Sequence, residues 1–172
     1  STNSTVLTLS SGMANLNKYT VNVANIRDRK GATISASSDS FYYSSTETGL
    51  VGEIYTNKTY SGTATVKLDP VIDETYAGGF LCFIFPTLCG TDISARWEGF
   101  ILAPRNGGYK FETISNDGSR LWVDDLSSPI IDHWNSESRS NVTNTSSPTR
   151  LSQGVYYPIR QDFFYDRDGF FF

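Results

Sequence analysis

The sequence predicts an all-β protein, and three observations lead to this prediction. Apolar and polar residues alternate with a period of two in several segments, as they do in half-buried strands. No segment keeps a 3.6-residue period, which amphipathic helices require. Turn-forming pairs such as Lys30-Gly31, Ser61-Gly62 and Asp117-Gly118 separate the alternating segments. Strands at this spacing are typical of an antiparallel β-sandwich or barrel.

The predicted strands divide into a short and a long group. Residues 19–23 alternate first, and residues 64–68, 109–113 and 121–123 alternate later. Between these groups, residues 37–49 are rich in Ser and Thr and are interpreted as a break. We therefore expect a segment of two or three strands with a linker over residues 1–48 and a larger β domain over residues 49–172. Its last strand, near residues 162–172, looks truncated.

Composition excludes several function classes. The chain has 172 residues, with 14 Lys and Arg against 18 Asp and Glu, and a net charge of −4. Without clustered positive charge, nucleic acid is not expected as a partner. No apolar run approaches the roughly 20 residues of a membrane-spanning helix. One histidine and two cysteines do not make a four-ligand zinc site, and a triad would depend on His133 alone. No pair of carboxylates is spaced to indicate a glycosidase, so we predict no catalytic residues.

Two features favour an oxidising, extracellular environment. Cys82 and Cys89 flank a Pro-containing turn, and we predict a local disulfide between them, worth about 2.5 kcal/mol in a loop-entropy model. The alternative is two unrelated buried thiols. Sequons for N-glycosylation begin at Asn3, Asn57, Asn141 and Asn144, the last two in a predicted exposed loop over residues 136–148. Since the chain starts at Ser1 without Met or a signal peptide, we interpret it as a mature or excised segment of a secreted or cell-surface protein.

The first group of strands resembles the C-terminal half of bacterial Ig-like domains. The resemblance covers residues 5–36 and is carried by Leu16-x-x-Tyr19-Thr20-Val21 and by Asn25-Ile26-x-Asp28-x-x-Gly31. Three strands are too few for an independent sandwich. We therefore expect residues 1–36 not to fold alone and to pair with strands of another chain or of a preceding segment.

The second group resembles the PA14 domain family. The motif begins at residues 93–104 and continues through Gly108-Tyr109, Ser115-Asn116-Asp117-Gly118 and Leu121-Trp122-Val123-Asp124-Asp125. It is completed by Trp134 and by Gly154-x-x-Tyr157-Pro158-Ile159, and residues 49–55 match the opening strand of the family. The resemblance implies a β-sandwich or barrel that is usually non-catalytic, with members that bind carbohydrate.

The resemblance also implies a ligand site. In the adhesin branch of the family, adjacent acidic residues hold Ca²⁺, and sugar hydroxyls complete its coordination shell. The matching positions here are Asn116 and Asp117, where Asn116 retains an oxygen ligand but loses a charge. The alternative for both positions is an Asx-type turn that only shapes the backbone. Asp124 and Asp125 follow the next strand as a further candidate pair, for which a plain β-turn is the alternative. Trp134 is a candidate sugar platform, for which core packing is the alternative. Arg120 is expected to pair with Asp124 or Asp132, or else to be a solvated strand residue.

Two functions follow from these observations. The first is a carbohydrate-binding, adhesive module of an extracellular or cell-surface structure, with glycans as partners and Ca²⁺ as a candidate cofactor. The alternative is a structural protomer of an extracellular filament. Its incomplete edges would be satisfied by β-strand exchange between subunits.

Overall fold

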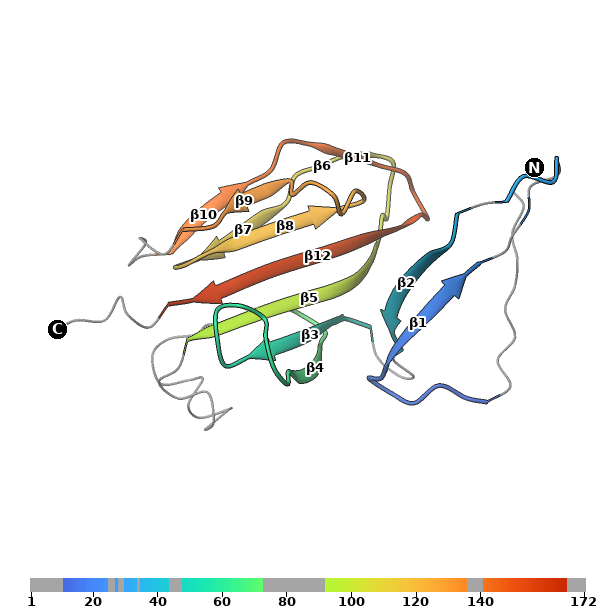
Figure 1. Ribbon diagram of the computed structural model, residues 1–172. Helices are drawn as coiled ribbons and strands as arrows, with labels where there is room; N and C mark the ends of the chain where they lie inside the picture. Colours follow the sequence, from blue (N-terminus) through green and yellow to red (C-terminus); the bar gives the residue numbers. More distant parts are fainter. Residues whose placement is uncertain are drawn as a thin grey trace. The chain divides into compact units, whose positions relative to one another are not determined.

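A computed structural model describes residues 11–24, 27, 30–33, 35–43, 48–72, 92–135 and 141–166. The chain divides into two compact units between Glu47 and Thr48. Throughout the described ranges the regular structure consists of strands, and every strand pair is antiparallel, which confirms the all-β prediction (Figure 1). A helix long and apolar enough to cross a membrane is not found in these ranges.

The first unit contains a two-stranded antiparallel sheet. It is formed by β1 (Lys18–Val23) and β2 (Ser37–Tyr42), which are in register along their whole lengths. The interpretation of residues 37–49 as a break is therefore wrong for its first half. Ser40 accepts or donates a hydroxyl hydrogen bond with Thr20 at 2.9 Å, and Phe41 stacks on Tyr19. These cross-strand contacts outweigh the low β-propensity of the Ser-rich segment.

The second unit is built on a six-stranded sheet with the order β4-β3-β5-β12-β8-β9. Its two longest strands, β5 (Ile93–Leu102) and β12 (Tyr156–Tyr165), pair over all ten residues at the centre. Residues 162–165 of the segment predicted as a truncated last strand belong to β12, which has a strand partner on each side. Residues 167–172 lie outside the described residues, so the truncation stays a prediction. The flanking strands are β3 (Leu50–Tyr55), β4 (Thr65–Asp69), β8 (Ser119–Val123) and β9 (Ile131–His133).

Two shorter strand pairs complete this unit. They join β6 (Gly107–Tyr109) with β11 (Thr149–Leu151), and β7 (Glu112–Ser115) with β10 (Val142–Thr145). In Figure 1 these strands gather at the β8–β9 side of the six-stranded sheet. Residues 109–113, predicted as one strand, are interrupted between β6 and β7. β10 lies inside the segment 136–148 predicted as a loop, because Val142 and Asn144 alternate with exposed Thr side chains and pair with β7.

The inward face of the six-stranded sheet carries the apolar core. Because side chains alternate along a strand, residues that are cross-strand partners share a face. One cluster is centred on Trp97 and Ile54, and a second one on Leu121 and Val123. Leu151 of β11 belongs to the second cluster, and Tyr109 of β6 and Phe111 between β6 and β7 pack against it, which joins the two layers.

Trp97 shows how the sequence positions this core. Its cross-strand partner is Gly52, where a Cβ would lie 2.7 Å from the indole nitrogen. The absence of a side chain at Gly52 therefore leaves room for the indole to cross β3. The indole N–H donates a hydrogen bond to Asp69 Oδ2 at 2.5 Å, and Asp69 Oδ1 lies 3.0 Å from Lys67 Nζ. The buried carboxylate of Asp69 is thus satisfied on both oxygens.

Candidate functional site

The outward face of the six-stranded sheet carries a row of alternating charges. Cross-strand pairing places Glu53, Arg96, Asp162, Arg120 and Asp132 side by side across five strands. Asp162 is buried and accepts hydrogen bonds from Nε and Nη2 of Arg96, both at 2.8 Å. It also accepts from Nε and Nη2 of Arg160 at 2.9 and 2.5 Å. We call the five cross-strand neighbours the charged row, which comprises Glu53, Arg96, Asp162, Arg120 and Asp132.

Electrostatics hold the centre of the charged row together. Burial by itself raises the pKa of Asp162, but hydrogen bonds from Arg96 and Arg160 outweigh burial and bring this pKa below its usual value. The hydrogen bond to Asp162 likewise raises the pKa of Arg96. At the end of the row, Arg120 Nε donates a hydrogen bond to Asp132 Oδ1 at 2.7 Å. Asp132 is one of the two partners predicted for Arg120. Asp132 is half exposed, so this second pair contributes less.

Each arginine of this face also covers an aromatic ring. Arg96 lies over Tyr60 at 4.8 Å, Arg120 over Trp134 at 4.5 Å, and Arg160 over Trp122 at 4.5 Å. These distances from guanidinium carbon to ring centroid are within the range of cation–π attraction. A ring covered by guanidinium has less free surface for a ligand, so this part of the face is largely self-satisfied.

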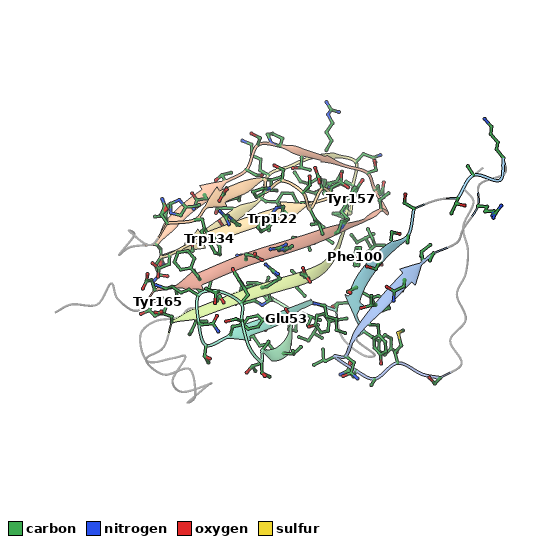
Figure 2. The ribbon with its side chains drawn as sticks, in the orientation of Figure 1. Glu53, Phe100, Trp122, Trp134, Tyr157 and Tyr165 are labelled. Atoms are coloured by element: carbon green, nitrogen blue, oxygen red, sulfur yellow. The ribbon has the colours of Figure 1, made fainter. Side chains whose placement is uncertain are left out.

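The predicted ligand residues lie at two opposite ends of β8. Asn116 and Asp117 precede β8, whereas Asp124 and Asp125 follow it. Because a strand rises roughly 3.3 Å per residue, the five residues of β8 span roughly 16 Å and separate the two pairs of residues. The pairing of Ser119 with His133 places Trp134 near the Asn116–Asp117 end. Figure 2 shows Trp134 and Phe100 at opposite ends of the sheet. The prediction of one site containing all four loop residues is therefore wrong, since β8 holds them apart.

The Asn116–Asp117 end is closed. Asp117 is buried; its Oδ2 accepts a hydrogen bond from the Asp166 N–H at 3.3 Å, and its carbonyl oxygen accepts one from Ser115 Oγ at 2.8 Å. Burial raises the pKa of Asp117. Beside it, Trp134 packs against Phe164 edge to face and stacks on Tyr60, in addition to its contact with Arg120. Trp134 is thus a member of a packed aromatic cluster, and the geometry gives no support to its role as a sugar platform.

The Asp124–Asp125 end is open. Asp124 has a positive φ of 70°, and its N–H donates to the carbonyl oxygen of Pro158 at 2.9 Å. Asp125 Oδ1 accepts from the Ser127 N–H at 2.8 Å, and hydrogen bonds from Ser127 lower the pKa of Asp125. Both aspartates are exposed and therefore carry acceptor oxygens at the surface.

Exposed apolar side chains adjoin this end, and sequence reasoning did not single them out. Phe100 pairs with Pro158 and Leu102 pairs with Tyr156, so all four side chains share the outward face. Phe100 is 59% exposed, Leu102 50% and Tyr156 66%. We call these four residues the open aromatic patch. The period of two in residues 93–102 could have indicated it, because Phe100 and Leu102 fall on the opposite face from Trp97 and Ile101.

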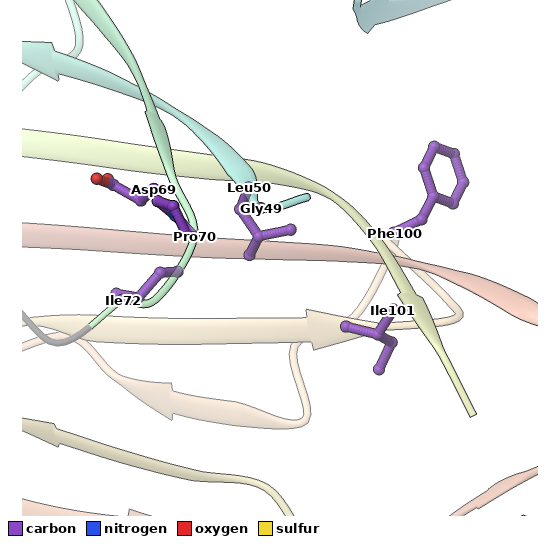
Figure 3. A pocket seen from close by; sticks show the side chains of 7 residues that line it. All are labelled: Gly49, Leu50, Asp69, Pro70, Ile72, Phe100 and Ile101. Carbon is purple, nitrogen blue, oxygen red and sulfur yellow. The ribbon is translucent and has the colours of Figure 1, made fainter. Parts of the chain in front are cut away.

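A shallow pocket adjoins the patch at Phe100. Gly49, Leu50, Asp69, Pro70 and Ile72 line it from β3, β4 and their flanking residues, and Phe100 and Ile101 line it from β5. Figure 3 shows Phe100 and Ile101 projecting from opposite sides of β5, which agrees with strand alternation. The pocket and the patch share Phe100, and we take the patch as the candidate site at the end of the sheet that Asp124 also borders.

The structure describes three of the four predicted glycosylation sites and neither of the two cysteines. The side-chain amide of Asn57 donates to the Ser61 carbonyl oxygen at 2.8 Å, and the amide nitrogen of Asn144 is buried with no hydrogen-bond partner among the described residues. Asn141 is exposed. Asn3, Cys82 and Cys89 lie outside the described residues, so the disulfide stays a prediction.

The family of the chain follows from comparison with known proteins. The sequence-family model of the PA14 domain matches residues 46–170 of this chain. The chain belongs to the PA14 domain family. The preceding Ig-like resemblance has no such support and stays a prediction. This PA14 domain occupies the second unit, which contains the charged row and the open aromatic patch.

Relatives of this PA14 domain occur in larger proteins. The chain is 34% identical over 120 residues to the anti-sigma-I factor RsgI3 of Acetivibrio thermocellus, covering 69% of this chain and 17% of that protein. A solved anti-sigma factor domain-containing protein is 33% identical with a TM-score of 0.57, covering 69% of this chain and 38% of that one. The PA14 sugar-binding domain of an RTX adhesin is 16% identical with a TM-score of 0.51, covering 70% and 84% of the two chains, and shows the shared fold. The chain thus spans well under half of the anti-sigma factors that it matches.

These relatives correct the predicted location. The expectation of an extracellular or cell-surface protein was based on the cysteine pair, the sequons and the start at Ser1. The relatives at 33–34% identity are instead anti-sigma factors by name. The predicted location is therefore not kept. None of the three relatives is named as an enzyme.

Proposed function

We propose that this PA14 domain is a non-catalytic carbohydrate-binding module that binds sugar at the open aromatic patch. The observation that carries the proposal is the exposure of Phe100 and Tyr156 on the outward sheet face beside Asp124. The apolar face of a pyranose ring packs on exposed aromatic rings, while its hydroxyl groups donate hydrogen bonds to carboxylates. Membership of a family with a sugar-binding member of the same fold supports this assignment.

The position of the patch separates this site from the sugar site predicted at Asn116 and Asp117. The closed end offers a buried carboxylate and a covered tryptophan, whereas the open end offers uncovered rings and exposed carboxylates. Large apolar side chains at a surface mark binding sites when they are contiguous. Phe100 and Tyr156 are diagonal cross-strand neighbours, which are roughly 7–8 Å apart in antiparallel sheets, and one sugar chain can contact both rings.

The anti-sigma relatives suggest the role of such a module within a longer protein. In this proposal, sugar occupancy of the patch is a signal that the module passes to the rest of the chain that carries it. The filament alternative, with strand exchange between subunits, has no specific contact in its favour among the described residues.

The test is a binding screen with matched variants of the full chain. An array of neutral and uronic acid-containing oligosaccharides identifies a binder, and calorimetry gives its affinity. We expect Phe100→Ala and Tyr156→Ala each to weaken binding by about tenfold or more, because each removes one stacking surface. Ile114→Ala is the control, since Ile114 is equally exposed but lies on β7. Binding that is unchanged in both aromatic variants would refute the patch as the site. Loss in the Asp117→Asn variant alone would return the site to the closed end.

A further inference from the structure

The loop between β3 and β4 is rigidly folded and carries one lysine toward the closed end. Asn57 Oδ1 accepts hydrogen bonds from the Thr59 N–H at 2.9 Å, the Thr59 hydroxyl at 3.0 Å and the Ser61 N–H at 3.2 Å. Tyr60, with a positive φ of 53°, donates from its N–H to Ser94 Oγ at 3.2 Å. These bonds fix the backbone on both sides of Lys58.

The ammonium group of Lys58 lies among carboxylates. Its Nζ is 2.8 Å from Asp166 Oδ2 and 3.7 Å from Asp92 Oδ2. The N–H of Asp166 in turn donates to Asp117 Oδ2. The strand ends of β5, β8 and β12 and the β3–β4 loop therefore meet around one positive charge. The side chain of Lys58 is about one-third exposed and that of Asp166 less than one-fifth, so water screens this contact only in part.

Among the described residues, the donor set at this end does not fit a calcium ion. Ca²⁺ takes six to eight oxygen ligands. Asn116 replaces one carboxylate of the family pair, and one oxygen of Asp117 already accepts a backbone N–H. In the described ranges, no three His, Cys, Asp or Glu side chains come together with the geometry of a metal site. An ammonium group needs no such cage, because its three N–H donors are satisfied by separate acceptors.

We propose that Lys58 supplies the positive charge at the Asn116–Asp117 loop in place of a divalent cation, so that this loop keeps its conformation without metal. The charge is carried by the chain itself, tied to Asp166 and through Asp166 to Asp117. Sugar binding elsewhere on the domain is then independent of Ca²⁺. The proposal stands apart from the open aromatic patch, because it concerns the opposite end of β8.

The experiment measures the thermal unfolding of the full chain with EDTA, CaCl₂ or MgCl₂ at equal ionic strength, together with Tb³⁺ luminescence sensitised by nearby aromatic rings. We expect the Tm of the parent to be the same in all three solutions and no sensitised emission that Ca²⁺ displaces. Lys58→Met removes the charge and keeps the length of the side chain, and should lower Tm by about 2–4 °C. Lys58→Arg should recover most of this loss.

Lys110→Met is the matched control, since Lys110 is an exposed lysine and the variant changes net charge equally. A rise in the parent's Tm that is specific to Ca²⁺, or displaceable Tb³⁺ emission, would overturn the proposal. So would a Tm of Lys58→Met equal to that of Lys110→Met. If Lys58→Met does not fold, the metal measurements on the parent and the Tm of Lys58→Arg decide the question.

Discussion

Asp162 is the residue whose neutralisation should cost this domain the most stability. It is 4% exposed and accepts four hydrogen bonds from Arg96 and Arg160. Asp162→Asn keeps the shape but leaves two guanidinium groups side by side without a counter-charge. Removing one partner of a buried ion pair costs about 3–5 kcal/mol. Because both arginine side chains are about one-quarter exposed, water screens the stranded charges, and we expect about 2–4 kcal/mol.

Urea and thermal unfolding measure this loss directly. For a domain of this size we expect a Tm lowered by roughly 6–12 °C. Asp132→Asn is the control, because Asp132 belongs to the same charged row and pairs with Arg120 but is half exposed. It should cost at most about 1 kcal/mol. If the two variants unfold at the same urea concentration, the reasoning from burial is refuted.

The pH dependence gives a second check on Asp162. Its pKa in the folded protein lies below the unfolded value of about 3.9, so its contribution is fully present above that value. The contribution is lost as the pH falls through the folded pKa. The difference in unfolding free energy between the parent and Asp162→Asn should therefore be constant from neutral pH to about pH 5 and shrink below about pH 4. A difference that grows on acidification would contradict this sign.

Two further predictions concern packing and the independence of the second unit. Gly118→Ala should destabilise the domain by about 1–3 kcal/mol, because a Cβ there would overlap the buried ring of Phe164; Phe164→Leu should relieve part of this cost, and additive effects in a double-mutant cycle would argue against the overlap. Deleting residues 1–47 should leave a second unit that melts cooperatively, since β1 and β2 pair with each other and belong to the first unit. A deletion variant without a cooperative transition in calorimetry would show that the second unit depends on the first.

The sequence was most informative where alternation and turns specify structure locally. Residues 64–68 and 121–123 were predicted from their period of two and are found as β4 and β8. β2 and β10 were missed because their Ser-, Thr- and Asn-rich segments become strands only through partners far along the chain. The predicted ligand residues came from the family resemblance and from turns on either side of one strand, and this strand of five residues is enough to separate them.

Contacts between distant residues explain why the electrostatic features were not predicted. Lys58 and Asp166 are 108 positions apart, and Arg96 and Asp162 are 66 apart. These ion pairs depend on strand order and register. A one-residue slip in register would move every side chain of a strand to the other face and break the pairing. Alternation could indicate that Arg96 and Glu98 share a face with Phe100, but not which strand lies beside them.

The outward face of the six-stranded sheet therefore has two parts with different physical roles. Where Arg96, Arg120 and Arg160 cover the aromatic rings, charge and π surface are satisfied within the domain and hold five strands in register. Two residues beyond Arg160 along β12, Pro158 pairs with Phe100 of β5 on the same face. Among the described contacts, no guanidinium group covers Phe100. Apolar surface left uncovered beside such a complete network costs solvation free energy that the folded domain does not recover by itself. A ligand that packs on Phe100 and Tyr156 would recover it, and the pairing of β5 with β12 over all ten residues sets the spacing of both residues before the ligand arrives.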